Sequence, residues 1–125
     1  MSEQAKWHPG DRAELKVDIT DKLVRDFSEW SGDKNPLHVD AEYAQTTRFH
    51  RRVAHGMSFG SLFSRLIGMN IPGPGALWTS QSFKFLKPVF IGDELLLSVE
   101  VIDFSQATGL MNLACKATNQ LGEEV

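Results

Sequence analysis

The chain contains 125 residues, of which 42% are hydrophobic and 23% are charged. This composition is typical of one folded domain and excludes the charge excess and low hydrophobicity of a disordered chain. The formal net charge is −3, and the basic residues are scattered apart from the pair Arg51 and Arg52, which argues against a nucleic-acid partner. Cys115 is the only cysteine, so an intramolecular disulfide and a cysteine-rich zinc site are excluded and a reducing compartment is expected.

No segment of the sequence has the pattern of a membrane span or a secretory signal. Residues Met1–Arg12 are polar and charged where a signal peptide needs an apolar core, and no apolar run approaches the length that spans a bilayer. No internal repeat, low-complexity tract or long linker divides the chain. We therefore predict a single domain over residues 1–125, a cytoplasmic location and no membrane partner.

The first half of the chain is predicted to contain a short strand, two helices and a loop. Residues Ala13–Ile19 alternate apolar and polar side chains, as a half-buried strand does. Thr20 is a suitable cap for a helix over Asp21–Trp30, in which the apolar residues fall at helical spacing. Residues 31–38 are rich in turn formers and are predicted to be a loop, and a short helix is predicted over residues 41–45.

The second half is predicted to contain one long helix followed by strands. From Gly56 to Met69 the apolar residues recur at i, i+3, i+4, i+7 and i+8, which predicts a buried helix that ends before the turn at residues 72–75. The period then changes to two, which predicts three strands at Leu77–Leu86, Glu94–Phe104 and Leu110–Thr118. This order of elements predicts an α+β domain in which an antiparallel sheet packs on one main helix.

The residues with the most chemical potential lie in the predicted loop. Asp33, Asn35 and His38 place a carboxylate, an amide and an imidazole within six residues, beside the rigid turn at Pro36. A carboxylate next to a histidine can act as a general acid–base pair with pKa values near neutrality. The same residues also suit ordinary turns, in which Asp33 and Asn35 bond to the backbone and His38 is only a loop residue.

A second candidate site lies at the start of the long helix, in residues 54–57. Gly56 leaves a backbone N–H accessible there, where the negative charge of an enolate or oxyanion would be favoured. Alternatively, Gly56 only permits a tight entry turn, and His55 caps or packs. No pair among the histidines and Asp40 has the i, i+4 spacing of a helical zinc site, so no metal is predicted.

Three stretches of the sequence together resemble the MaoC-like (R)-specific enoyl-CoA hydratases. The first runs from Phe27 to Asp40 and contains Asp-x-Asn-Pro-x-His, and the second is the Ala-His-Gly-Met of residues 54–57. The third runs from Phe83 to Asp93 and combines a strand pattern, a proline and a Gly-Asp turn. They occur in the family's order and cover nearly the whole chain. The resemblance implies a hot-dog fold, in which an antiparallel sheet wraps around a long central helix.

The resemblance also implies roles for individual residues. The implied catalytic residues are Asp33, His38, Asn35 and Gly56, and the implied substrate-binding residues are Ser64 and His55. In this scheme Asp33 and His38 transfer protons, Asn35 orients them, and the Gly56 N–H stabilises the thioester oxyanion. The implied substrate is an acyl-CoA or acyl-carrier-protein thioester, the implied assembly is a homodimer or higher homo-oligomer, and no cofactor or metal is implied.

Three related activities stay open from the sequence. They are dehydration of (3R)-hydroxyacyl-acyl-carrier protein, thioester hydrolysis, and non-catalytic binding of an acyl thioester. The presence of both Asp33 and His38 disfavours the non-catalytic alternative. Chains of the family also run past the point that matches Gly122–Val125 into a further strand of roughly five to ten residues, so either the last strand is missing from the domain or the sheet is completed in another way, for example by a partner.

Overall fold

A three-stranded antiparallel sheet forms one layer of the computed structural model, which describes residues 6–125. The strands are β1 (Arg12–Asp18), β2 (Glu94–Phe104) and β3 (Met111–Thr118). Backbone hydrogen bonds place β2 between β1 and β3. Three of the four predicted strands are thus confirmed to within one residue at each end. Residues 1–5, part of the polar N-terminal stretch for which no signal peptide was expected, lie outside the described residues.

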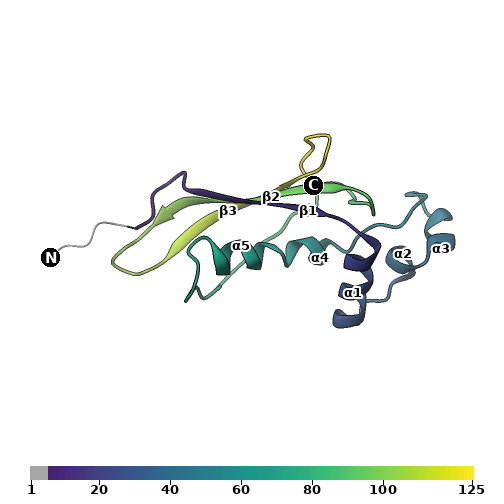
Figure 1. Cartoon of the computed structure of the whole chain (residues 1–125), viewed down its shortest axis with the longest axis horizontal. Coiled ribbons are helices and arrows are strands. Elements are labelled where there is room, and N and C mark those ends of the chain that lie inside the picture. The colour runs from purple at the N-terminus through teal and green to yellow at the C-terminus, as the bar shows by residue number, and fades with distance from the viewer. Residues whose placement is uncertain (1–5) are drawn as a thin grey trace.

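The hydrophobic core lies between β2 and two helices, α4 (Gly56–Gly60) and α5 (Phe63–Met69). Alternate side chains of a strand point to one face, and four alternate residues of β2 are completely or almost completely buried: Leu95, Leu97, Val99 and Val101. Phe59 of α4 and Leu66 of α5 belong to the same core. Figure 1 shows α4 and α5 running along one face of the sheet. The structure therefore has the predicted α+β arrangement of a sheet on a helical layer.

The helical layer is interrupted where the sequence predicts one continuous helix over Gly56–Met69. The Oγ of Ser58 donates to the His55 carbonyl at 2.6 Å, and the Oγ of Ser61 donates to the Ser58 carbonyl at 2.8 Å. Hydroxyl groups that bond to the backbone of the preceding turn compete with the helix and bend it. The N–H of Ser64 then bonds three residues back, to Ser61, as in a tighter helix. The prediction of a single long helix is wrong, because periodicity identifies an apolar face and not the backbone hydrogen bonds.

The predicted strand Leu77–Leu86 is also wrong. Within the described residues, its backbone is tied to the rest of the fold at Leu86, whose N–H donates to the Val125 carbonyl at 3.0 Å. A groove of about 1630 Å³ lies between this segment and β3. Most of its side chains are exposed, including Leu77 at 85%. An alternating pattern is not sufficient for a strand, since a strand also needs a neighbour that bonds to its backbone.

Three short helices gather at one end of the sheet, beyond α4 (Figure 1): α1 (Asp21–Ser31), α2 (Pro36–Val39) and α3 (Ala41–Gln45). The first and third match the predicted helices to within one residue, whereas α2 overlaps the end of the loop predicted over residues 31–38. The side-chain oxygen of Asn35 accepts from the Leu37 N–H at 3.0 Å, and a proline occupies the first helical position, which explains this short helix. None of the helices in residues 6–125 has the length and apolar character to span a membrane.

Candidate active site

The two motifs singled out in the sequence meet at the end of the sheet that carries the short helices. Asp33 lies in the loop before α2, His38 lies on α2, and His55 directly precedes α4. One ligand-type atom from each of these side chains lies within 4.8 Å of the other two. Together with Gly56 and Phe85, they line a cavity of about 660 Å³. The predicted catalytic pair and the predicted oxyanion donor therefore share one cavity.

The hydrogen bonds of His38 determine which of its nitrogens carries the proton. Nδ1 lies 2.5 Å from the Val53 carbonyl oxygen, which can only accept. The neutral imidazole therefore has its proton on Nδ1, and Nε2 keeps a free lone pair. A histidine held in this way can accept a proton from water or return one to a substrate.

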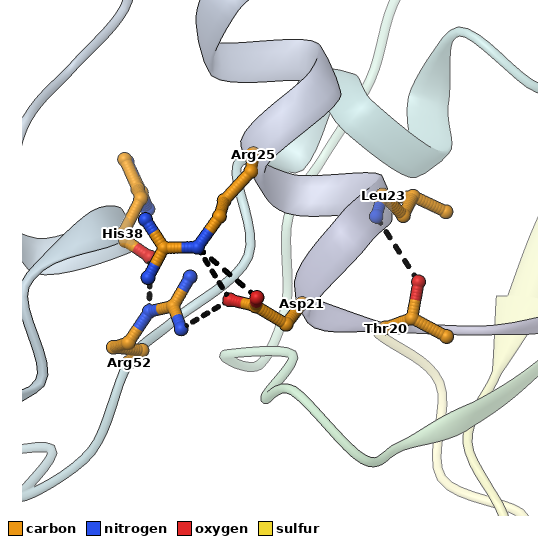
Figure 2. A network of polar contacts seen from close by, with 6 residues as sticks. All are labelled: Thr20, Asp21, Leu23, Arg25, His38 and Arg52. Atoms are coloured by element: carbon orange, nitrogen blue, oxygen red, sulfur yellow. Dashed lines mark hydrogen bonds and ion pairs between the residues drawn. The ribbon is translucent and has the colours of Figure 1, made fainter.

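The main chain of His38 is held by Arg52, a largely covered arginine that belongs to the basic pair noted in the sequence. The Nε of Arg52 donates to the His38 carbonyl at 2.6 Å, and its Nη1 donates to Asp21 Oδ1, also at 2.6 Å (Figure 2). Arg25 contacts the same carboxylate at 2.9 Å, as Figure 2 also shows. The hydrogen bond from Arg52 is the largest cause that lowers the pKa of Asp21 below its ordinary value. This network joins the start of α1 to the end of α2, which carries His38.

The loop that carries Asp33 is fixed through its backbone, which leaves the carboxylate at the edge of the cavity. The Asp33 carbonyl accepts from Ser28 Oγ at 2.8 Å and lies 2.9 Å from His55 Nε2. The carboxylate accepts from the Asn35 N–H at 3.2 Å, as in an ordinary Asx turn. Asn35 itself uses its side chain to cap α2, the helix that carries His38.

His55 forms the buried wall of the site. Its side chain is 3% exposed, and its ring stacks on His38 with a centroid distance of 3.9 Å and an interplanar angle of 29°. Phe27 packs on the same ring at 4.9 Å. Burial lowers the pKa of His55, and the nearby His38 lowers it further, while the contact with Asp33 acts in the opposite direction. The ring therefore stays neutral at pH 7, which is above its ordinary pKa of 6.5.

Gly56 is the first residue of α4, so its N–H takes no part in the hydrogen bonds within that helix. A Cβ on this residue would lie 2.6 Å from the ring of Phe85, a distance that real Cβ atoms do not reach. Close approach by Phe85 thus requires glycine here, where the sequence analysis weighed an accessible N–H against a tight turn. The apolar ring beside the N–H belongs to the unpaired segment 77–86, which the sequence analysis did not connect with the site.

Ser64 is not brought to the site within the described chain. It is exposed on α5 and does not line the cavity, whereas Phe59 of α4 does. The break between the two helices separates the part that faces the cavity from the part that carries Ser64. Its role in substrate binding stays a prediction from the resemblance.

The proximity of Asp33, His38 and His55 raises the question whether they could hold a metal ion. Each histidine already uses one nitrogen on a backbone carbonyl. Because the two rings stack nearly face to face, their in-plane lone pairs run side by side and do not converge on an ion at about 2.0 to 2.1 Å. The arrangement suits proton transfer between a carboxylate, a water and an imidazole better than it suits coordination.

Known proteins resemble this chain over nearly its whole length. The model of the MaoC like domain matches residues 5–121. The (R)-specific enoyl-CoA hydratase of Aeromonas caviae is 39% identical over 113 residues, which cover 90% of this chain and 84% of the relative. The 3-hydroxybutyryl-CoA dehydratase of Methylorubrum extorquens is 40% identical over 111 residues, which cover 89% of this chain and 69% of the relative.

Solved structures confirm the predicted hot-dog fold. The (R)-hydratase from A. caviae superimposes with a TM-score of 0.93 at 36% identity, covering 98% of this chain and 92% of that one. The R-hydratase PhaJ1 from Pseudomonas aeruginosa superimposes with a TM-score of 0.91 at 38% identity, covering 96% of this chain and 77% of that one. Because the family model, the sequence identity and the fold agree over almost every residue, this chain belongs to the MaoC-like domain family.

Proposed function

We propose that the protein is an (R)-specific enoyl-CoA hydratase, which adds water reversibly to a trans-2-enoyl-CoA and forms a (3R)-hydroxyacyl-CoA. The observation that carries this proposal is the cavity that Asp33, His38 and Gly56 line together. The names of relatives with about 40% identity support the same reaction. The enzyme is accordingly a hydro-lyase.

The reaction needs three groups, and the cavity offers one residue for each. A water placed between Asp33 and His38 loses a proton to one of them while its oxygen bonds to C3 of the enoyl thioester. The electrons of the double bond move toward the thioester carbonyl, and the Gly56 N–H stabilises the negative charge on that oxygen. A proton from the pair then reaches C2, so that one H and one OH have been added and the pair regains its starting state.

Dehydration of a 3-hydroxyacyl thioester is a second candidate for the physiological direction. The same steps in reverse use the same residues, and relatives include a mitochondrial 3-hydroxyacyl-[acyl-carrier-protein] dehydratase of Arabidopsis thaliana that is 44% identical over 79 residues. Comparison of crotonyl-CoA with crotonyl-acyl-carrier protein distinguishes the carriers. The preferred carrier is the one with the higher kcat/KM.

Crotonyl-CoA tests the reaction itself. Hydration removes the absorbance of the conjugated thioester without releasing a thiol, and the product is the (3R) enantiomer. Release of free CoA would instead support the thioesterase alternative, and no change in either signal would support a non-catalytic module. The rate is expected to persist after exhaustive chelation, since side chains and a backbone N–H perform every step. Activity restored only by a divalent ion would overturn this mechanism.

We further propose that the protein forms at least a homodimer in a reducing cytoplasm. The outer edges of β1 and β3 have no partner strand among residues 6–125 except near Thr118, and apolar side chains such as Leu77 and Leu110 are exposed. Open edges and exposed apolar groups favour association, and a two-fold dimer is the commonest form.

The proposed reducing cytoplasm is consistent with the lone Cys115, which cannot form an intramolecular disulfide. Light scattering that showed an active monomer at micromolar concentration would contradict the dimer, and cell fractionation checks the compartment.

A further inference from the structure

His55 is a buried polar residue whose place in the site is not explained by the three groups that perform the chemistry. Its ring lies between Phe27 on one side and His38 on the other, at centroid distances of 4.9 and 3.9 Å. Its Nε2 lies 2.9 Å from the carbonyl oxygen of Asp33. One side chain thus contacts the backbone of one member of the catalytic pair and the ring of the other.

The chemistry of these contacts assigns the state of the ring. The Asp33 carbonyl can only accept, so the proton is on Nε2. The Nδ1 atom is buried and has no hydrogen-bond partner among the described residues. A proton on Nδ1 would therefore add an unpaired buried N–H and a positive charge directly against His38. The titratable groups that face His55 are His38 and Asp33, one from α2 and one from the preceding loop.

We propose that His55 is a positioning residue, which acts as a neutral Nε2–H imidazole to fix Asp33 and His38 relative to one another. The hydrogen bond from His55 Nε2 fixes the position of the Asp33 carbonyl, and stacking on the His55 ring limits the tilt of the His38 ring. This proposal rests on the proposed hydratase reaction and assigns His55 no contact with the reacting atoms.

Positioning of this kind affects the rate more than substrate affinity. The two groups must lie at hydrogen-bond distance from one water, and a displacement of 1 Å can cost roughly a hundredfold in rate. Ser28 Oγ also bonds to the Asp33 carbonyl, and Val53 and Arg52 also hold His38, so the loop remains attached when His55 is replaced. We therefore expect loss of precision and not loss of the fold.

Two complementary variants separate the two contacts. His55→Phe keeps an aromatic face for His38 and loses the donor to Asp33, whereas His55→Gln keeps a donor and loses the ring. Each is expected to lower kcat on crotonyl-CoA about tenfold while KM changes less than threefold. His8→Gln is the matched control, because His8 is exposed and far from the site in sequence, and it should keep the wild-type kcat.

A double-variant cycle distinguishes positioning from a direct role. If His55 acts through the pair, adding His55→Gln to Asp33→Asn should lower kcat by less than twofold further, since the pair is already disabled. A full tenfold loss in that background would show that His55 acts on the substrate independently. A raised KM with unchanged kcat would show a binding contact, and two variants with wild-type kcat would show that His55 only packs. Each of these results overturns the proposal.

A spectroscopic measurement on the wild-type protein tests the assignment even if a variant does not fold. With ¹⁵N-labelled histidine, His55 should show a protonated Nε2 and an unprotonated Nδ1 at pH 7. A proton on Nδ1 alone, or a charged ring at that pH, would contradict the proposal. The spectrum does not depend on catalysis, so failure of the hydratase assay and failure of this inference are distinguishable.

Discussion

The site end of the molecule and the segment Leu77–Leu86 are built in opposite ways. Around His38, hydrogen bonds from residues far apart in the sequence converge on one short helix: Val53 accepts from its ring, and Arg52 donates to its carbonyl. Along Leu77–Leu86, by contrast, one backbone bond at Leu86 attaches the segment to the rest of the described fold, and a large groove separates it from β3.

The difference shows which parts of the site need an exact position and which parts only have to form a wall around the substrate cavity. The proposed proton transfer requires a fixed geometry, and charged and backbone hydrogen bonds, which are directional, hold the site end. An apolar wall needs shape and not direction, and the segment 77–86 contributes Phe85 and Leu86 to the wall of the site cavity. Variants at the site end should therefore change the rate, and variants in the segment should change little else than packing.

Removal of the catalytic pair is expected to have the largest effect. Asp33→Asn and His38→Ala should each lower kcat by about 10² to 10⁴, the usual contribution of a positioned acid or base. KM should change far less, because the carrier and acyl chain supply most of the binding. The double variant should be little worse than the worse single one, since the pair acts as a unit. Steady-state kinetics on crotonyl-CoA measure these effects. A wild-type kcat in either variant would show that the motif containing Asp33 and His38 is only a structural turn.

Arg52→Gln tests whether the network in Figure 2 matters for the rate. Its loss removes the hydrogen bond to the His38 carbonyl and leaves Asp21 with Arg25 as its partner, so kcat should fall roughly tenfold through a shift of α2. Arg51→Gln is the matched control, because Arg51 is exposed and stacks on Phe90 at 3.7 Å without contacting His38. Equal kcat values for the two variants would show that the network is not needed.

Gly56→Ala places a methyl group against the ring of Phe85. The ring is half exposed and can move, so the variant should be destabilised by about 1 to 3 kcal/mol, near the lower end of that range. Thermal unfolding measures this loss. Adding Phe85→Ala should cost less in the Gly56→Ala background than in the wild type, because it relieves the contact. Additive effects would show that the two residues do not press on each other in solution.

The pH dependence of stability should reveal the buried state of His55. Its folded-state pKa lies below the ordinary 6.5, so the unfolded chain binds more protons as the pH falls past that value. The contribution of His55 to the free energy of unfolding is therefore fully present above pH 6.5. It is lost as the pH falls from 6.5 toward the folded-state pKa. The pKa values of Asp21 and Glu123 are also lowered, so the stability that these carboxylates contribute is lost only at more acidic pH, as the pH falls below 3.8 for Asp21 and below 4.5 for Glu123. Melting temperatures between pH 7.5 and 5 should decline more in the wild type than in His55→Phe, and equal slopes would contradict this.

Leu77→Ser is expected to have the smallest effect. The side chain is 85% exposed and lies in the loosely attached segment, so the free energy of unfolding should change by less than about 0.5 kcal/mol. Denaturant unfolding at low protein concentration measures the change. A loss above 1 kcal/mol, or a change in mass by light scattering, would show that the segment is covered in solution and sharpen the proposal of a dimer.

Much of the fold could be predicted because its signals are local. Thr20 and Asp40 cap the helices that follow them, and the two-residue period of Glu94–Phe104 matches β2 in both bounds. The cap on α2 was also readable, since Asn35 followed by proline is a helix start, but the turn-rich composition outweighed it. The candidate pair Asp33 and His38 could be selected from spacing, because both lie in one short segment.

The sequence by itself determined which segments are amphipathic, which residues can transfer protons and which family the motifs resemble. Only the tertiary structure decided which contacts those residues make: Arg52 bonds to the main chain of His38, His55 contacts both Asp33 and His38, and Phe85 packs against the glycine at the start of α4. The hydrogen bonds among these contacts join residues 14 to 31 positions apart, and no local propensity encodes them. The segment Leu77–Leu86 shows that a local pattern can also mislead. An alternating sequence forms a strand only where the fold supplies a neighbouring strand that bonds to its backbone.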